Sequence, residues 1–551
     1  MKANKSNSYM NEMNQITIPL ENLLKPGSAP DADRIDLLAV GSEVARQYHF
    51  LPQPVFVEIE GNQVVIEFPD ASDQNKAEAA RLAGRAAKHA SNGDCQRAIR
   101  IWKRVLELVP SDLVTRRDLG MAYVELGDVA KARQCLAEAL LIDPEDPGSL
   151  VALANLENDQ KDYAKAETYA RKALAAAPQD PLAKNCFGAV LFRTERFDQA
   201  LGVFQDTIKS DPQFATPYST AAYIYLRQGH LELADQTLRN MFARTKEQDV
   251  RCKPLFAQAR RMFGRVQVAL ADKHQAEQRQ AVDALFDSVK EQTGCPVRVI
   301  EEHCDQAPVG LVEFAWQHRR DHHRILVRPV YPQILQPHLW AHQAMYIRQG
   351  YEAWQAGRSR LFYLTEDQRL AVLGAFESRV HRLRREGYEL EWLRDRILVL
   401  VGSLFNGLYS IPLGMVAETR ILQEMPVLAP QQFLALTTSD YQGTGDGTQL
   451  LSRLMPARYL RALAGLYGVH ALFMDSLCPG ASDCADKYRQ WDGFELAQKL
   501  WQHWQAKIRT LQPGDDYDLV DEFADILGLR GLYSWHPDQP CGPDLAISLQ
   551  E

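Results

Sequence analysis

Residues 118–147 read DLGMAYVELGDVAKARQCLAEALLIDPEDP, and the spacing of small and bulky residues in this stretch recurs along the first half of the chain. Alanine recurs every 34 residues, at Ala98, Ala132, Ala166, Ala200 and Ala234. Proline recurs with the same period, at Pro110, Pro144, Pro178 and Pro212. A bulky residue follows most of these alanines by four positions: Trp102, Leu136, Phe204 and Leu238. A fixed period of this length predicts an array of equal structural units.

The spacing has a physical explanation in pairs of packed helices. A small residue lets the two helices of a hairpin approach closely, and the bulky residue four positions later fills the groove between neighbouring hairpins. Proline cannot continue a helix, so its position after the second helix ends each unit. The pattern resembles the tetratricopeptide repeat at its small and aromatic positions. This resemblance implies five helical hairpins at about 79 to 248, arranged as an α-solenoid.

The repeat frame also predicts a binding surface. Solenoids of this kind present a concave groove lined by the first helix of each repeat, and the frame assigns eight residues to it: Arg117, Met121, Asn155, Asn185, Phe192, Arg193, Tyr223 and Arg227. Any one of them could equally be an ordinary solvated position. As a set they combine arginine, asparagine and aromatic side chains, which suits a protein or peptide ligand with acidic and apolar side chains.

Four segments follow from the change of pattern along the chain. Residues 1–30 are polar and are expected to be a flexible N-terminus, and 31–76 read as a small α+β element with a hairpin around Glu60-Gly-Asn-Gln63. The solenoid occupies 77–250. Residues 251–551 read as a helical C-terminal domain with a short sheet within 296–329. The fold class expected for the whole chain is therefore mainly α.

Composition excludes several classes of function. The 551 residues carry a formal net charge of -9, which argues against general binding to nucleic acid or to anionic membranes. The nine cysteines have no metal-finger spacing and read as reduced thiols. No uninterrupted run of 18 apolar residues and no signal-peptide pattern occurs, so the expected location is the cytoplasm. Neither the identity of the partner nor the oligomeric state follows from the sequence.

The stretch 338–350, HLWAHQAMYIRQG, resembles the metal-binding helix of the zincin metallopeptidases. In their HExxH motif two histidines one turn apart bind zinc, and the glutamate acts as general base. In one frame His342 matches the first histidine, while Gln343 and Tyr346 stand where the glutamate and the second histidine belong. The resemblance further implies that Glu418, in the later segment IPLGMVAE, matches the third, acidic ligand.

A second frame places both histidines differently. His338 and His342 have the required i, i+4 spacing, but Leu339 stands where the base should be. Here Glu418 or Glu352 could complete a metal site without a base. The bland alternative is that both histidines are polar residues on a partly exposed helix whose other side is buried.

The chemistry argues against an active peptidase. The amide of Gln343 cannot accept a proton from an attacking water, and Tyr346 binds zinc poorly unless it is deprotonated. We therefore expect a degenerate remnant of a metal site at His338, His342, Gln343, Tyr346 and Glu418, with no metal, no cofactor and no catalytic residue. The predicted function is a protein-interaction scaffold carrying an inactive metallopeptidase-like domain. The alternative is a zinc-dependent hydrolase with a non-standard ligand set.

Overall fold

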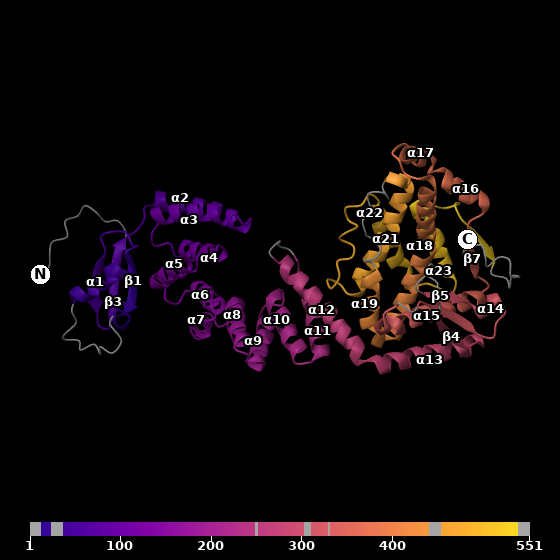
Figure 1. The fold of residues 1–551 in the computed structure, drawn as a ribbon. Helices are drawn as coiled ribbons and strands as arrows, with labels where there is room; N and C mark the ends of the chain where they lie inside the picture. Colours follow the sequence, from indigo (N-terminus) through magenta and orange to yellow (C-terminus); the bar gives the residue numbers. More distant parts are fainter. Residues whose placement is uncertain are drawn as a thin grey trace. The chain divides into compact units, whose positions relative to one another are not determined.

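A computed structural model describes residues 13–23, 37–247, 252–301, 310–328, 331–439 and 453–537. The chain divides into two compact units, Met1–Ala221 and Ala222–Glu551, and the division falls within helix α10 (Ala215–Arg227). Figure 1 labels the elements of both units. Both units are mainly helical, which confirms the predicted fold class.

The first unit begins with a three-stranded antiparallel sheet. Strand β3 (Gln63–Pro69) lies between β1 (Met13–Pro19) and β2 (Phe56–Glu60), and helix α1 (Leu37–Gln47) accompanies them. The hairpin is confirmed, because Glu60 pairs with Gln63. The expectation of a flexible N-terminus is wrong for Met13–Pro19. Its apolar Ile16 and Ile18 are buried against this sheet, whereas residues 1–12 and 24–30 lie outside the described part of the chain.

Helical hairpins follow at the predicted period. The helices of the first unit after the sheet are α2 (Asp73–Ser91), α3 (Cys95–Leu108), α4 (Leu113–Glu125), α5 (Val129–Ile142), α6 (Pro147–Asp159), α7 (Tyr163–Ala176), α8 (Pro181–Arg193) and α9 (Phe197–Ser210). Aspartate side chains cap the N-termini of α3 to α8, where each accepts a backbone N–H: Asp94, Asp112, Asp128, Asp146, Asp162 and Asp180. These caps also recur every 34 residues, so each helix start is specified locally.

The small residues of the repeat lie at close helix contacts, as predicted. Ala132, Ala166 and Ala200 are fully buried. A Cβ atom on Gly188 would lie only 2.6 Å from the ring of Phe204, and one on Gly120 only 2.8 Å from the side chain of Leu136. Both glycines are therefore required by the approach of the bulky residue on the next helix.

The second unit opens with three helices and a small sheet. The helices are α11 (Leu231–Arg244), α12 (Lys253–Lys273) and α13 (Gln275–Thr293). In the sheet, β6 (His323–Val327) pairs in parallel with β4 (Val297–Glu301) and antiparallel with β5 (Gly310–Glu313). All three strands fall within the segment expected to form a short sheet, and the short helix α14 (Ala315–His318) connects β5 to β6. Helix α15 (Gln336–Gln355) follows and carries the histidine stretch.

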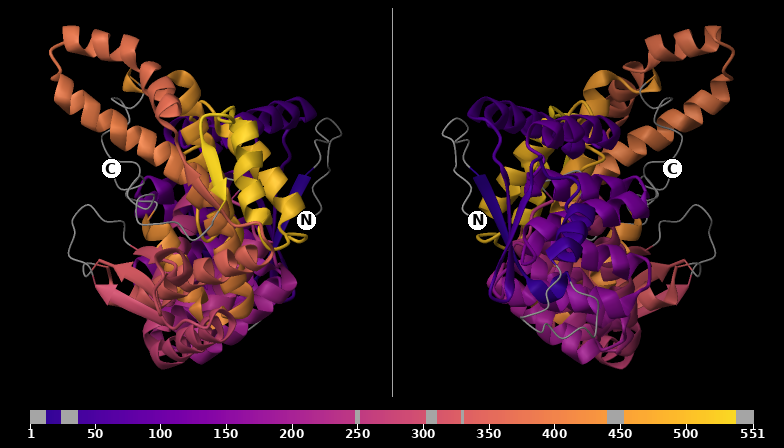
Figure 2. Two further views of the ribbon diagram at one scale, coloured as in Figure 1. Left: turned by 90° about the vertical axis from the view of Figure 1, so that its right-hand side faces the viewer. Right: turned by 90° about the vertical axis from the view of Figure 1, so that its left-hand side faces the viewer.

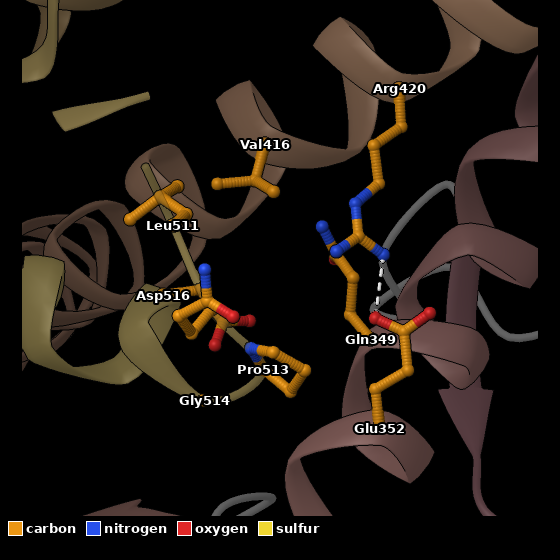
Figure 3. A pocket seen from close by; sticks show the side chains of 9 residues that line it. Gln349, Glu352, Val416, Arg420, Leu511, Pro513, Gly514 and Asp516 are labelled. Carbon is orange, nitrogen blue, oxygen red and sulfur yellow. Dashed lines mark hydrogen bonds and ion pairs between the residues drawn. The ribbon is translucent and has the colours of Figure 1, made fainter. Parts of the chain in front are cut away.

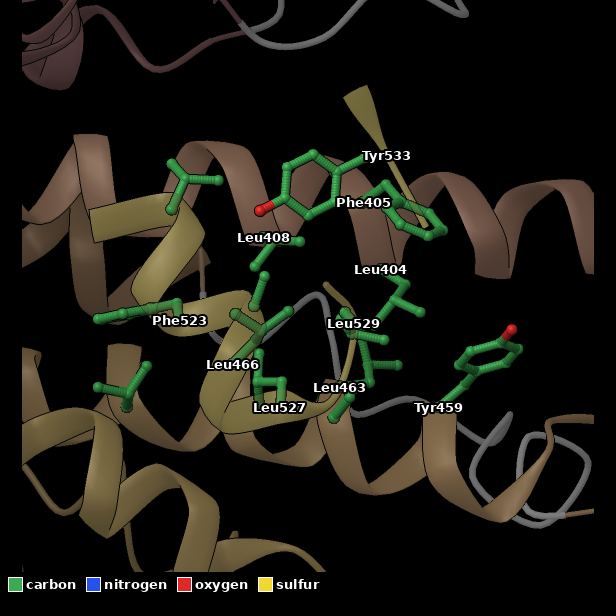
Figure 4. Packing of buried hydrophobic residues seen from close by; sticks show 14 of the residues in the cluster. Leu404, Phe405, Leu408, Tyr459, Leu463, Leu466, Phe523, Leu527, Leu529 and Tyr533 are labelled. Carbon is green, nitrogen blue, oxygen red and sulfur yellow. The ribbon is translucent and has the colours of Figure 1, made fainter. Parts of the chain in front are cut away.

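The rest of this unit is a helical bundle around its largest core. Its helices are α16 (Glu366–Gly374), α17 (Glu377–Arg385), α18 (Leu390–Glu424), α19 (Ala429–Ser439), α21 (Ala457–Leu477), α22 (Phe494–Lys507) and α23 (Asp515–Leu527). Figure 4 shows how apolar side chains of α18, α21 and α23 meet, among them Leu404, Leu408, Leu463, Leu466 and Phe523. A two-stranded sheet of β7 (Arg360–Tyr363) and β8 (Ser534–Pro537) was not expected.

Helix α18 is unusually long. In the views of Figure 2 its N-terminal part (orange) projects from the bundle together with α17, and Leu398 and Val399 there are exposed. Among the described helices, α18 is long and apolar enough to cross a membrane, judged by length and composition alone. Its C-terminal half is packed instead into the bundle, where Met415, Ala417 and Glu418 are buried.

The glycine contacts predict a pair of opposite effects on stability. Gly188→Ala should lower the free energy of unfolding by ~1–3 kcal/mol, because the added methyl group collides with Phe204. A methyl group added at Gly202, on α9, would have no atom within 4 Å. Gly202→Ala should therefore raise the free energy of unfolding by up to ~1 kcal/mol through helix propensity. Urea denaturation followed by circular dichroism measures both. Equal effects of the two substitutions would contradict the close contact.

Candidate functional site

The groove residues predicted from the repeat frame lie on the first helices of their hairpins. Arg117 and Met121 are on α4, Asn155 is on α6, and Asn185, Phe192 and Arg193 are on α8, all in the first unit. Tyr223 and Arg227 are on α10 in the second unit. Met121, Asn155, Arg193, Tyr223 and Arg227 are exposed.

Some of these side chains serve the fold. Nη1 of Arg117 lies 3.1 Å from Oδ1 of Asp146, the residue that caps the next first helix. The side-chain oxygen of Asn155 accepts a weak hydrogen bond from the Cys186 thiol, and the ring of Phe192 packs on Phe197. The first two contacts join neighbouring repeats, and the third lies within one hairpin. Met121 and Arg193 are therefore the predicted residues of the first unit most open to a ligand.

Sequence reasoning missed two apolar positions on the same helices. Val114 and Leu182 are 52% and 57% exposed. They occupy the same repeat position, 68 residues apart. Val114 lies seven residues before Met121, and Leu182 lies three before Asn185 and eleven before Arg193, spacings that place each on the helix face of a predicted groove residue. The 34-residue period would have found them if exposed apolar residues had been sought at equal positions. Their inclusion makes this surface more apolar than predicted.

The second candidate site centres on a buried carboxylate in the C-terminal unit. Glu418, on α18, is 2% exposed. Its Oε2 atom lies 2.9 Å from Nε2 of His338, and its Oε1 atom lies 2.7 Å from Nδ1 of His342. The two histidines are one turn apart on α15, so α15 and α18 meet at this carboxylate. The second sequence frame therefore identified the residues that come together.

A third helix completes the environment of Glu418. Nε2 of Gln432, on α19, donates to Oε2 of Glu418 at 2.6 Å and to its backbone carbonyl at 2.8 Å. Burial alone would raise the pKa of Glu418, but its interactions with His338 and then His342 lower that pKa well below 4.5. The carboxylate is therefore ionised and joins three helices.

The residues that belong only to the first frame lie apart from this carboxylate. Gln343 is buried beside Gly310 of β5. The hydroxyl of Tyr346 donates to the backbone carbonyl of Ser410 at 3.3 Å, and its ring stands edge-on to His342. Burial, followed by nearby Tyr409 and Glu418, raises the pKa of Tyr346 far above its usual range. Tyr346 therefore remains a neutral phenol.

The donor set contains the right residue types for zinc but not the right geometry. Two ligand atoms on one tetrahedral zinc stand roughly 3.3 Å apart, given bond lengths of ~2.0–2.1 Å. Here His338 and His342 lie 2.9 and 2.7 Å from two different oxygens of one carboxylate. Within the described ranges, no group of three His, Cys, Asp or Glu is arranged to hold a metal ion. Glu352, the other possible third ligand, pairs with Arg420 at 2.8 Å.

The position of the catalytic base is occupied by an apolar side chain. Leu339 is 8% exposed and packs with Met345 and Ile421 in a buried cluster beside the small sheet. Neither Leu339 nor the amide of Gln343 can take a proton from water. These residues therefore supply no base in the position that peptide hydrolysis requires.

Comparison with known proteins bears on the first half of the chain. Residues 86–157 and 147–180 match sequence models described as "Tetratricopeptide repeat". Residues 86–180 are therefore tetratricopeptide repeats, which confirms that resemblance. The family comparison gives no support for the zincin resemblance of the C-terminal unit.

Similar proteins share only a segment with this chain. The BBSome complex member BBS4 of Bos taurus is 27% identical over 109 residues, which cover 20% of this chain and 21% of that protein. The type IV pilus assembly protein PilF of Pseudomonas aeruginosa is 31% identical over 94 residues, which cover 16% of this chain and 37% of PilF. The crystal structure of YrrB, "a TPR protein with an unusual peptide-binding site", is 23% identical with a TM-score of 0.25, covering 31% of this chain and 88% of YrrB.

The buried carboxylate predicts a pH-dependent loss of stability on substitution. At pH 7, Glu418→Gln should lower the free energy of unfolding by ~3 kcal/mol or more, because it removes the charged partner of the buried His338 ring and the partly exposed His342 ring. A depressed folded-state pKa contributes stability that is present above about 4.5 and lost as the pH falls through the lower folded value. The difference in free energy of unfolding between Glu418→Gln and the unaltered protein should therefore shrink below pH 4.5.

A matched substitution on the same helix serves as control. Glu424 is half-exposed and pairs with Arg348 at 2.5 Å, so Glu424→Gln should cost less than ~1 kcal/mol. Chemical denaturation between pH 3.5 and 8 measures both variants. Similar, pH-independent effects of the two substitutions would show that Glu418 does not join the three helices electrostatically.

Proposed function

We propose that this protein is an interaction scaffold whose tetratricopeptide repeats bind a protein or peptide partner, while its C-terminal unit is a catalytically silent, metallopeptidase-like domain with a binding or regulatory role. The observation that carries the proposal is the row of exposed residues on the first helices of the repeats. Val114 and Met121 on α4 and Leu182 on α8 are large apolar side chains left 49 to 57% exposed on one kind of helix face. Exposed apolar side chains that recur on the same helix face of different repeats support a binding surface there.

The chemistry of the surface indicates the kind of partner. Arg193 lies on α8 with Leu182, is exposed, and forms no ion pair with another side chain of the described chain. An apolar row beside an unpaired arginine suits a peptide with aliphatic and acidic side chains. The net charge of -9 supports a protein partner over a nucleic acid. The names of two relatives, a BBSome complex member and a type IV pilus assembly protein, also refer to protein assemblies.

The silent character of the C-terminal unit is supported by the residues around Glu418. Leu339 is buried where a zincin would have its base, and the Glu418 carboxylate is shared by two histidines and Gln432. These contacts stabilise the packing of α15, α18 and α19. A domain that retains this framework without a base is suited to recognising a partner rather than cleaving it.

The alternative, a zinc-dependent hydrolase with a non-standard ligand set, has one observation in its favour. His338, His342 and Glu418 do lie in mutual contact, as that reading requires. Their N–O distances are shorter than those between two ligands of one zinc, and no base lies beside them, so we favour the scaffold. Metal content separates the two readings.

The scaffold proposal predicts loss of partner binding from changes on the repeat surface. Met121→Glu combined with Arg193→Glu should lower the affinity for a partner recovered by affinity purification at least about tenfold. The double change removes an apolar contact and reverses a charge. Surface plasmon resonance with the purified partner measures the affinity.

A control tests whether the effect is local. Leu126 is 47% exposed, close to the 49% of Met121, but follows α4 on a different side. Leu126→Glu should leave the affinity unchanged, and circular dichroism should show the same helicity for all variants. Unaltered binding by the double variant would remove this surface as the partner site.

A further inference from the structure

A pocket lies between α15, α18 and the segment that leads into α23, away from the Glu418 carboxylate. Figure 3 shows Gln349 and Glu352 reaching it from α15, Arg420 and Val416 from α18, and Asp516 from α23. Leu511, Gln512, Pro513 and Gly514 complete its wall. These residues are separated by up to 167 positions in the chain, and none belongs to the sequence-predicted site except Glu352, the alternative third ligand.

Two side chains of this pocket are buried with unused hydrogen-bonding atoms. Gln349 is 4% exposed, and neither its side-chain oxygen nor its nitrogen has a partner among the described residues. Asp516 is 6% exposed, and its Oδ1 atom likewise has none there. A buried polar atom without a partner is destabilising, so three such atoms on one pocket require an explanation. Together they present two acceptors and one donor.

The charges of the pocket favour a cation. Nη1 of Arg420 lies 2.8 Å from Oε2 of Glu352, so these two charges largely offset each other. Asp516 then remains as the unpaired charge. Burial raises the pKa of its carboxyl to about 6, although backbone N–H groups of Tyr517 and Asp516 itself lower it in part. At neutral pH the lining therefore carries one uncompensated negative charge.

The dimensions restrict the group that can enter. The pocket has a volume of about 240 Å³ including its open mouth, but only about 10 Å³ can hold the centre of a water-sized group. That inner space suits one small polar group, and the open mouth beside it admits the atoms bonded to that group. A metal ion is disfavoured because no group of three His, Cys, Asp or Glu among the described residues is arranged to hold one. An ammonium group has the matching size, charge and donors.

We propose that this pocket binds an α-aminoacyl head group, an ammonium with an adjacent carbonyl, from a free amino-acid derivative or from the N-terminus of a peptide. The ammonium donates to Oδ1 of Asp516 and to the side-chain oxygen of Gln349. The carbonyl beside it accepts from the Gln349 nitrogen. The rest of the ligand leaves through the mouth, past the exposed Gln512 and Pro513. This site lies outside the repeats and does not rest on the scaffold function.

The test uses the full-length protein and small probes that separate the parts of the head group. Isothermal titration calorimetry at pH 7 should detect binding of glycinamide, which has both parts, and weaker binding of ethylammonium, which lacks the carbonyl. N-acetylglycinamide, which lacks the ammonium, should not bind. Triglycine distinguishes the two sources: equal or tighter binding than glycinamide indicates a peptide N-terminus, and exclusion indicates a free amino-acid derivative.

Two near-isosteric variants and a control locate the site. Asp516→Asn and Gln349→Met should each lower the affinity for glycinamide at least about tenfold, since each removes a hydrogen bond to a charged group. Gln355→Leu, an exposed position later on α15 that does not line the pocket, should change nothing. Circular dichroism establishes that each variant is folded, and Gln349→Met keeps the test decisive if Asp516→Asn is not.

The pH dependence provides an independent readout. Binding of an ammonium requires ionised Asp516, whose pKa is about 6. Glycinamide affinity should therefore rise between pH 5 and pH 7, and this rise should disappear in Asp516→Asn. The other charged groups facing the pocket, Arg420 and Glu352, are paired with each other. Failure of glycinamide to bind at millimolar concentration, or equal binding of N-acetylglycinamide, would overturn the proposal.

Discussion

One buried carboxylate organises the C-terminal half of this protein. Glu418 lies at the meeting point of α15, α18 and α19, and it is ionised because two histidines and a glutamine satisfy its oxygens. A buried charge without such partners would cost several kcal/mol. The residue types at positions 338, 342 and 418 are therefore constrained by the fold itself. This constraint accounts for two histidines one helical turn apart on α15 through packing alone.

The first half depends on a different constraint, the distance between paired helices. Gly120 and Gly188 leave room for Leu136 and Phe204, and the alanines of the repeat are fully buried at the same kind of contact. Each hairpin then presents its first helix in an equivalent way, so exposed residues such as Val114 and Leu182 recur on the same face. Packing in the repeat thus determines which side chains remain available to a ligand.

The sequence predicted those parts of the fold that have a local or periodic signal. The 34-residue period gave the hairpins, and alternation of apolar and polar residues gave the turn between Glu60 and Gln63. Strand β1 was missed because Ile16 and Ile18 lie in an otherwise polar segment. Their side chains are buried where β1 pairs with β3. The i, i+4 spacing of His338 and His342 correctly placed them on one helix face.

Contacts between distant segments had no comparable signal. Strands β7 and β8 pair across more than 170 residues, and Gln349 meets the same pocket as Asp516 from a helix far away in sequence. Nothing in either local sequence indicates this meeting. The choice between the two metal-site frames also required coordinates, because only the path of α18 shows that Glu418 reaches His338 and His342 rather than Tyr346.

The central claim is that His338, His342 and Glu418 join helices and do not hold a catalytic metal. Metal content tests it most directly. Full-length protein, purified without chelator, mixed with equimolar zinc and then desalted, is analysed by inductively coupled plasma mass spectrometry beside a His342→Ala variant. The account predicts far less than one zinc per chain, with no difference between the two proteins. One zinc per chain that is lost in His342→Ala would contradict it and favour the hydrolase.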